Sequence, residues 1–381
     1  MIYLDYNATT PCAPEVVAAM LPYFTHKFGN PASRTHAMGW QADEAVQIAK
    51  RQVAALIGAA EQELIFTSGA TESCNLALKG VFEVMKGFGN HIITCRTEHK
   101  AVLDTCTHLE QSGARITYLE VNREGHIDLE ALEEAFTPDT ILIALMYANN
   151  ETGVLHPVKE IGMIAKKHKV YFFCDATQAI GKVAVNVEED GIDLLALSAH
   201  KFYGPKGIGV LYTRRRSPRV QLIAQMDGGG HQNGFRSGTL NVPAIVGLGK
   251  AAALSQENRI NLIPKIGAIR DAVAQQLLQL EGAVENGDVH HRLPHVLNIA
   301  FEGIKAERLV SILNNEIAFS VGSACTSAQQ KSSHVLEGMH LPPSVIEGSI
   351  RLSFGQYNTM EEAEIVAGKI TQAVNQLKIK S

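Results

Sequence analysis

Six short apolar runs recur along the first two thirds of the chain and predict buried β-strands. They are the segments 63–68, 91–95, 140–147, 170–175, 193–198 and 207–212. Between several of them, the segments 70–87, 100–113 and 158–169 have the pattern of helices. Strands that alternate with helices form mostly parallel sheets covered on both faces, so the pattern predicts an α/β fold with such a sheet flanked by helices.

A different region is expected to begin at the segment 266–280, whose apolar residues recur at helical spacing. The chain has 381 residues, which exceeds the usual size of one hydrophobic core. We predict a large domain at 15–255. A smaller α+β domain is formed by 1–14 with 256–381, and it carries a mobile cysteine loop at about 320–335.

Composition narrows the class of protein. Apolar residues make up 46% of the chain and charged residues 19%, values typical of a globular protein, and the net charge of −5 argues against a nucleic-acid coat. The start, MIYLDYNATT, lacks the features of a signal peptide, and the apolar run 141–148 is too short to span a bilayer. We therefore expect no membrane association and a cytoplasmic location. In that compartment the six scattered cysteines, which contain no CxxC pair, should be reduced thiols.

Reactive side chains follow five of the predicted strands, where the site of a doubly wound sheet lies. In chain order they are Gly69 and Thr71, His99, Asn149 and Asn150, Asp175 and Gln178, and the group Ser198, His200 and Lys201. The carboxyl ends of these strands should therefore bring a lysine, a carboxylate, a histidine and several hydroxyls to one edge.

These residue types are the ones that a pyridoxal phosphate site needs. Lys201 would bind the cofactor aldehyde, Asp175 would keep the pyridine nitrogen protonated, and His99 would stack on the ring. Thr71 begins a helix after a glycine, which suits the phosphate. Taken singly, each residue also fits a purely structural role, such as a solvated lysine, a helix cap or a core histidine. Five strand ends with matched roles favour the cofactor site.

One cysteine stands apart from the others. Cys95 and Cys174 lie in apolar runs and suit buried positions, whereas Cys325 lies in SVGSACTSAQQ, a segment of small residues. Such a segment is expected to form a mobile loop, so Cys325 is a candidate for a reactive thiol.

Nine motifs in order carry a resemblance to a known family: LDYNATTP, FTSGATES, TEHKAVLDTC, NNETG, DATQ, SAHKFYGPKG, GGGHQNGFRSGT, GSACTS and SIRLSFG. Together they resemble the class V pyridoxal-phosphate cysteine desulfurases, of the long-loop group (group I) that serves iron–sulfur cluster assembly and thiolation. The resemblance runs from Tyr3 to about Gly355. It implies fold type I, with a sheet of seven strands and a smaller α+β domain.

The resemblance also implies a role for each site residue. Lys201, His99 and Cys325 are the catalytic residues, and Arg351 and Asn150 bind the substrate. The cofactor contacts are Ala70, Thr71, His99, Asn150, Asp175, Gln178, Ser198, His200, Lys201 and Thr239. L-cysteine would become L-alanine, and Cys325 would carry the sulfur as a persulfide to an acceptor protein. Thr239 would reach the phosphate of a neighbouring subunit, which implies a homodimer.

Departures from the family pattern leave the acceptor open. Cys74 stands where the family usually has Asp, and the chain ends without the long C-terminal tail that grips the scaffold protein in many members. An iron–sulfur scaffold, tRNA thiolation and DNA phosphorothioation all remain candidate pathways, and a second sulfur relay at Cys74 is conceivable. A selenocysteine lyase, another class V enzyme and an inactive scaffold remain alternatives to a desulfurase.

Two further segments suggest no additional function. The basic segment 214–219 is interpreted as a solvated loop, so direct nucleic-acid binding is not expected. The three histidines in the segment 290–295 are interpreted as structural, and no metal is expected.

Overall fold

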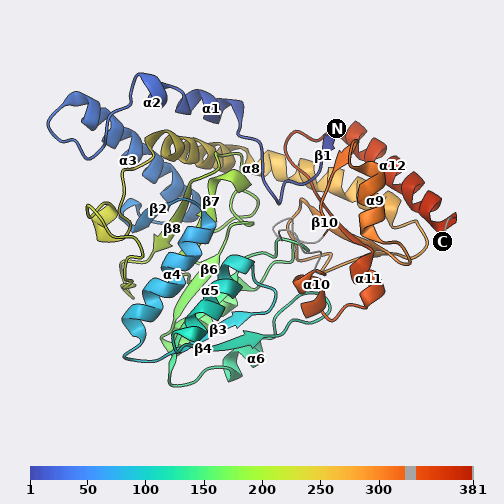
Figure 1. The fold of residues 1–381 in the computed structure, drawn as a ribbon, viewed down its shortest axis with the longest axis horizontal. Coiled ribbons are helices and arrows are strands. Elements are labelled where there is room, and N and C mark those ends of the chain that lie inside the picture. The colour runs from blue at the N-terminus through green and yellow to red at the C-terminus, as the bar shows by residue number, and fades with distance from the viewer. Residues whose placement is uncertain (322–331, 380–381) are drawn as a thin grey trace.

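A seven-stranded sheet forms the centre of the larger part of the molecule (Figure 1), in a computed structural model that describes residues 1–321 and 332–379. Its strand order is β2-β8-β7-β6-β5-β3-β4, and only β8 runs antiparallel to its neighbours. The strands are β2 (Leu64–Thr67), β3 (His91–Cys95), β4 (Arg115–Leu119), β5 (Thr140–Met146), β6 (Tyr171–Asp175), β7 (Leu194–Ser198) and β8 (Gly209–Thr213). The six predicted strands and the mostly parallel α/β sheet are confirmed.

Strand β4 is the one member of this sheet that the apolar pattern did not predict. It lies at the edge, pairs only with β3, and leaves Arg115 exposed, whereas most residues of the other six strands are buried. An edge strand has one neighbour, so it needs fewer apolar residues and gives a weaker sequence signal.

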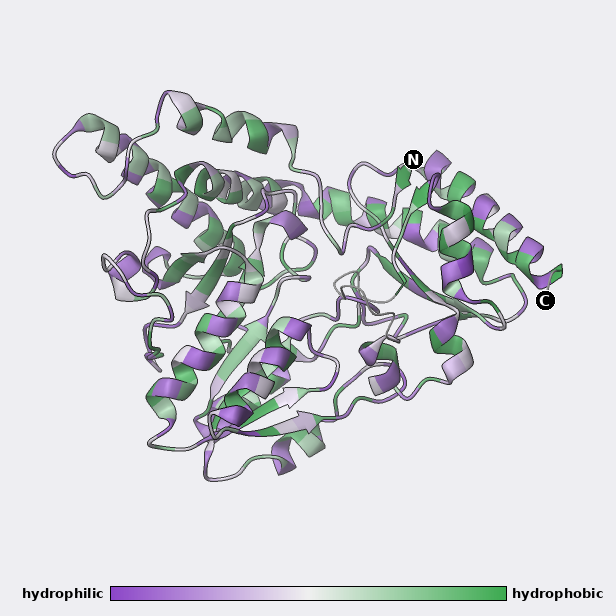
Figure 2. Cartoon of the chain, viewed as in Figure 1, coloured by the Kyte–Doolittle hydropathy of each residue, from purple (hydrophilic) through white to green (hydrophobic). Residues whose placement is uncertain are grey.

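Helices cover both faces of the sheet. On one face, α3 (Ala37–Ile57), α7 (Val158–His168) and the first half of α8 (Val242–Leu277) share a core with the sheet. On the other face lie α4 (Ala70–Met85) and α5 (Lys100–Gln111). In Figure 2 much of the sheet is green, whereas α4 and α5 show alternating purple and green bands, as expected of helices with one polar and one apolar face. The remaining helices of this part are α1 (Pro14–Met20), α2 (Pro22–Thr25) and α6 (Leu129–Glu134), with three short 3-10 helices, η1 (Glu61–Glu63), η2 (Ala199–Lys201) and η3 (Gln232–Gly234).

The C-terminal residues form a smaller α+β unit beside the large sheet (Figure 1). An antiparallel sheet of order β12-β10-β9 packs with helices around its own apolar cluster, which also contains Leu4. The strands are β9 (Ala283–Glu285), β10 (Val296–Phe301) and β12 (Ser349–Ser353), and the parallel pair β1 (Ile2–Tyr3) and β11 (Ile317–Ala318) lies alongside. Helices α9 (Ala306–Leu313) and α12 (Met360–Ile379) pack into this cluster, whereas α10 (His334–Gly338) packs into the core of the large sheet and α11 (Pro343–Glu347) contacts β10.

Helix α8 corrects one expectation. A helix was expected to begin a separate region near residue 266, but α8 is continuous over 36 residues from Val242 to Leu277. Its first half packs into the large core through Ile245, and its second half packs into the small core through Ile269. Residues 256–258 between them are exposed, so this stretch lacks the apolar periodicity that reveals a helix in sequence. The division into two domains near residue 255 stays a prediction.

No helix within 1–321 and 332–379 combines the length and the apolar character needed to cross a membrane. The five cysteines in that part of the chain are all unpaired.

Candidate active site

A cavity of about 480 Å³ lies beyond the carboxyl ends of β2, β3, β5, β6 and β7. Nine of the predicted site residues line it: Ala70, Thr71, His99, Asn150, Asp175, Gln178, Ser198, His200 and Lys201. The structure therefore brings together residues that are far apart in sequence, as expected for parallel strands whose carboxyl ends meet at one edge. Thr239 and Arg351 do not line this cavity, and Cys325 lies outside the described residues.

The N-terminus of α4 forms one wall of the cavity. Gly69 precedes the helix with φ +152°, a conformation that a residue with a Cβ rarely adopts. No side chain caps the helix, so the N–H groups of its first turn are available beside the hydroxyls of Thr71 and Ser198. Glu72 in the same turn is paired with Arg236 at 2.8 Å, which offsets its negative charge. This arrangement suits a phosphate group.

Lys201 ends the short helix η2, directly after β7. Its Nζ donates hydrogen bonds to the carbonyl oxygens of Asn7 at 2.5 Å and Ala8 at 2.8 Å. The N-terminal segment of the chain thereby holds the amine at the cavity wall.

Asp175 ends β6 as a buried carboxylate. Its Oδ1 accepts a hydrogen bond from the backbone N–H of Thr177 at 3.0 Å, and the thiol of Cys74 lies 3.9 Å from its Oδ2. Cys74 is fully buried on α4, and burial, followed by the charges of Asp175 and Glu98, raises the pKa of its thiol well above the usual value. A buried and protonated thiol is a poor nucleophile, so the structure gives no support to a sulfur relay at Cys74.

His99 is the N-cap of α5, and its Nδ1 accepts the backbone N–H of Ala101 at 3.1 Å. Burial lowers the pKa of His99, the charge of Lys201 lowers it further, and Asp175 opposes the change. The ring is therefore neutral near pH 7, and because Nδ1 is an acceptor, its proton is on Nε2. The second histidine of the cavity, His200, has a pKa lowered to about 4 by burial and then by nearby lysines.

Two buried oxygens of the cavity wall have no hydrogen-bond partner among the described residues, Oδ1 of Asn150 and Oγ1 of Thr177. Such groups are costly to bury unless a ligand or water satisfies them. Gln178 is better held, because its Nε2 donates to the carbonyl of Asn7 at 3.1 Å and its Oε1 accepts from Lys182 at 3.4 Å. The cavity thus presents polar groups that a polar ligand would satisfy.

Arg351 lies on β12, outside the cavity. It is buried, and its guanidinium contacts the carboxylate of Asp5 at 2.7 Å and the carbonyl of Asn150 at 2.9 Å. The residue therefore reaches the back of the cavity wall through Asn150. Thr239, by contrast, is exposed on the surface.

The N-terminal segment 5–9 is the functional element that the sequence reasoning missed. It holds Lys201 through two carbonyls, Gln178 through one of the same carbonyls, and His200 through the hydroxyl of Thr9 at 3.1 Å. The signal was present in the motif LDYNATTP, but spacing alone could not show which side chains the motif contacts. Thr177 was missed in the same way, within DATQ.

Another group of side chains that suits a metal lies outside the cavity, formed by Glu124, His126 and Asp288. His126 and His291 both contact the Oδ2 of Asp288, at 2.7 and 3.1 Å. These mutual hydrogen bonds account for the arrangement. The third histidine of the segment 290–295, His295, contacts the Oδ1 of Asn7 at 2.7 Å.

The residues present fit pyridoxal phosphate. An uncapped helix N-terminus with hydroxyls suits the phosphate, a buried carboxylate suits a protonated ring nitrogen, and a lysine and a neutral histidine face the same space. The partnerless oxygens of Asn150 and Thr177 are further groups that a polar ligand would satisfy.

Comparisons with known proteins agree with this chemistry. Residues 2–366 match the family described as aminotransferase class V. A cysteine desulfurase IscS of Anaeromyxobacter dehalogenans (strain 2CP-C) is 49% identical over 378 residues, which are 99% of this chain and 93% of that relative. A solved NifS-like protein has a TM-score of 0.91 at 35% identity and covers 99% of both chains. The structure titled SspA in complex with cysteine has a TM-score of 0.83 at 34% identity, over 94% of this chain and 100% of that one. The chain therefore belongs to the class V aminotransferase family, among its pyridoxal-phosphate cysteine desulfurases.

Proposed function

We propose that this protein converts L-cysteine to L-alanine and carries the released sulfur as a persulfide on Cys325. The observation that carries the proposal is the single cavity in which Lys201, Asp175 and His99 meet beside an uncapped helix N-terminus. Likeness over nearly the full length to a cysteine desulfurase supports the same reaction.

The cofactor would be held by the chain's own residues. Lys201 would bind its aldehyde, Asp175 its pyridine nitrogen and the first turn of α4 its phosphate, while Ser198 and His200 complete the phosphate site. When bound, pyridoxal phosphate supplies an electron sink that allows the Cα–H bond of an amino acid to ionise.

Proton transfer is assigned to two residues. Lys201 lies at the cavity wall. Once the substrate amine has replaced Lys201 at the cofactor aldehyde, the free lysine amine can accept the proton from the substrate Cα. His99 is neutral and carries its proton on Nε2, so it can donate that proton to the substrate. Arg351 would bind the substrate α-carboxylate, since a planar guanidinium suits a bidentate pair, and Asn150 lies between it and the cavity.

Sulfur leaves through Cys325. Its thiolate attacks the substrate sulfur, an S–S bond forms as the C–S bond breaks, and the carbon keeps the electron pair and takes a proton to become alanine. The persulfide would then pass sulfur to an acceptor protein.

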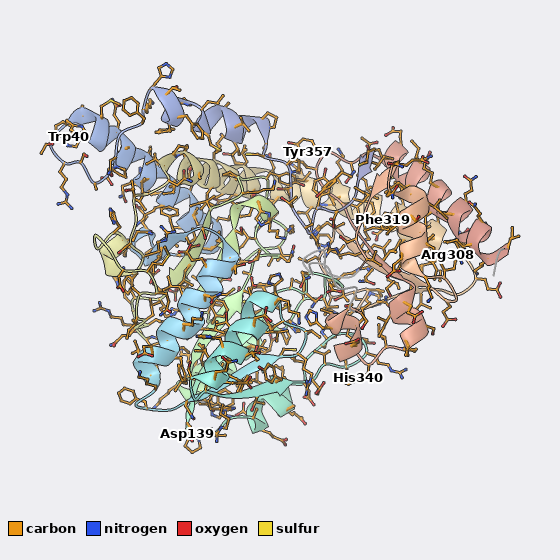
Figure 3. All side chains as sticks on the ribbon, in the orientation of Figure 1. Trp40, Asp139, Arg308, Phe319, His340 and Tyr357 are labelled. Atoms are coloured by element: carbon orange, nitrogen blue, oxygen red, sulfur yellow. The ribbon has the colours of Figure 1, made fainter. Side chains whose placement is uncertain are left out.

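We also propose a homodimer with composite sites. Thr239 is exposed and is not part of the cavity lining of its own chain, as expected of a residue that serves a partner's phosphate. Apolar side chains are exposed on α1–α3 and their connections: Val17, Leu21, Phe24, Phe28, Trp40 and Ile48. Figure 3 shows Trp40 at the outer edge of this part, where a second subunit could cover it. A cytoplasmic location stays a prediction from the sequence.

The first experiment combines a visible absorbance scan with the intact mass after incubation with L-cysteine. The wild type should show a cofactor band and gain the mass of one or more sulfur atoms, and Cys325→Ser should keep the band but lose the gain. Cys12→Ser is the matched control, because Cys12 is the one described cysteine that is not fully buried. A band without protein-bound sulfur would contradict the persulfide and favour a lyase. Comparing the turnover of selenocysteine with that of cysteine distinguishes a selenocysteine lyase from a cysteine desulfurase.

A further inference from the structure

The environment of Arg351 contains a carboxylate that the proposed reaction does not use. The Nη2 atom of Arg351 donates to Asp5 Oδ1 at 2.7 Å and to Ser320 Oγ at 3.1 Å, and Nη1 donates to the carbonyl of Asn150 at 2.9 Å. Ser320 also donates from its hydroxyl to the same Asp5 oxygen at 2.8 Å. The two residues of the ion pair lie 346 positions apart, so the tertiary fold alone creates it.

The pair is asymmetric in its burial. The Arg351 side chain is 2% exposed and the Asp5 side chain 17% exposed. A cation that is buried this deeply must keep an anionic partner, because an unpaired buried charge is very costly. Asp5 is closer to water and can be rehydrated more easily if it loses its partner. Arg351 can therefore exchange one carboxylate partner for another, but it cannot remain buried without an anionic partner.

The position of the pair directs that exchange to the active site. Arg351 contacts the backbone of Asn150, whose side chain lines the cavity and has an Oδ1 without a partner in the described part of the chain. The Nε of Arg351 also has no partner there. While it is bound to Asp5, Arg351 is absent from the cavity lining. To bind a substrate there, its guanidinium has to leave Asp5.

We propose that Asp5 is an internal competitor that occupies Arg351 until the α-carboxylate of an amino acid displaces it. The inference rests on the proposed role of Arg351 as the carboxylate ligand. Asp5 would thus weaken the binding of every ligand that has an α-carboxylate, and it would leave the binding of amines without a carboxylate unchanged. It sets selectivity and affinity, and it takes no part in bond breaking.

The test measures dissociation constants on the holoenzyme by titrating the cofactor absorbance with L-alanine and with ethylamine, which lacks the carboxylate. Asp5→Asn keeps the size of the side chain and removes its charge. We expect it to lower the dissociation constant of L-alanine about tenfold, or about 1.4 kcal/mol, and to leave that of ethylamine unchanged. Asp5→Glu and Ser320→Ala are the matched controls and should stay close to the wild type, because each retains a carboxylate opposite Arg351.

The outcomes separate the inference from the proposed function. An unchanged or weaker affinity of Asp5→Asn for L-alanine, or an equal gain for both ligands, would overturn the competitor role. If Arg351→Gln still preferred L-alanine over ethylamine as the wild type does, the proposed carboxylate role of Arg351 would fail instead. Should Asp5→Asn not fold, the wild-type crystal structure with L-alanine decides. We expect the Arg351–Asp5 contact to be broken there, and an intact contact refutes the exchange.

Discussion

Lys182 offers the sharpest test of the electrostatics behind the active site. It is buried, it lines a small cavity of about 80 Å³ together with Lys201 and His295, and its Nζ donates to Gln178 Oε1. Burial, and then the charge of Lys201, lowers the pKa of Lys182 from 10.5 to about 7. The folded protein therefore holds this proton more weakly than the unfolded chain does.

The sign and the size of the effect follow from proton linkage. Because the folded pKa is the lower one, Lys182 destabilises the fold most below about pH 7, and this cost declines as the pH rises toward 10.5. A pKa change of one corresponds to about 1.36 kcal/mol, so the cost is about 5 kcal/mol near pH 6 and about 2 kcal/mol near pH 9. The free energy of unfolding should thus rise by about 3 kcal/mol between those pH values because of this lysine.

Lys182→Met removes the charge and keeps a side chain of similar length. Urea unfolding of wild type and variant at several pH values between about 6 and 9 measures the difference, with Lys166→Met on exposed α7 surface as the control. We expect the variant to be the more stable protein near pH 6, and its advantage over the wild type to be smaller by about 3 kcal/mol near pH 9. A variant that keeps the full pH dependence of the wild type would refute the reasoning.

Two further predictions concern the wall of the cavity. Gly69→Ala places a Cβ at φ +152° and should weaken the binding of pyridoxal phosphate about tenfold. A fluorescence titration of the cofactor-free protein with pyridoxal phosphate measures this affinity. An unchanged affinity would contradict the phosphate site proposed at the N-terminus of α4. Cys74 should resist iodoacetamide in the native protein while Cys12 reacts, because Cys74 is fully buried and the pKa of its thiol is strongly raised. Peptide mass mapping measures both thiols, and early labelling of Cys74 would show that it is accessible.

Much of the candidate site could be predicted from sequence because it depends on local order and one topological rule. Asp175 and Lys201 each follow a buried strand directly, and parallel strands bring their carboxyl ends together. His99 and Asn150 also follow buried strands and were predicted for the same reason. Strand β4, an edge strand with a weak apolar pattern, and the continuous path of α8 through its exposed middle were not predictable from local periodicity.

The sequence by itself determined the α/β class, the identity of the strands that form the buried centre of the sheet, and the edge where the reactive side chains gather. These follow from apolar periodicity and strand direction, which are local properties. Only the tertiary structure decided that Asp5 pairs with Arg351, and that carbonyls 194 and 193 positions away hold Lys201. Those contacts join the N-terminal segment to distant strands, and nothing local in the chain encodes a partner so far away. The physical reason is that a buried charge needs a partner, but the fold decides which residue supplies it.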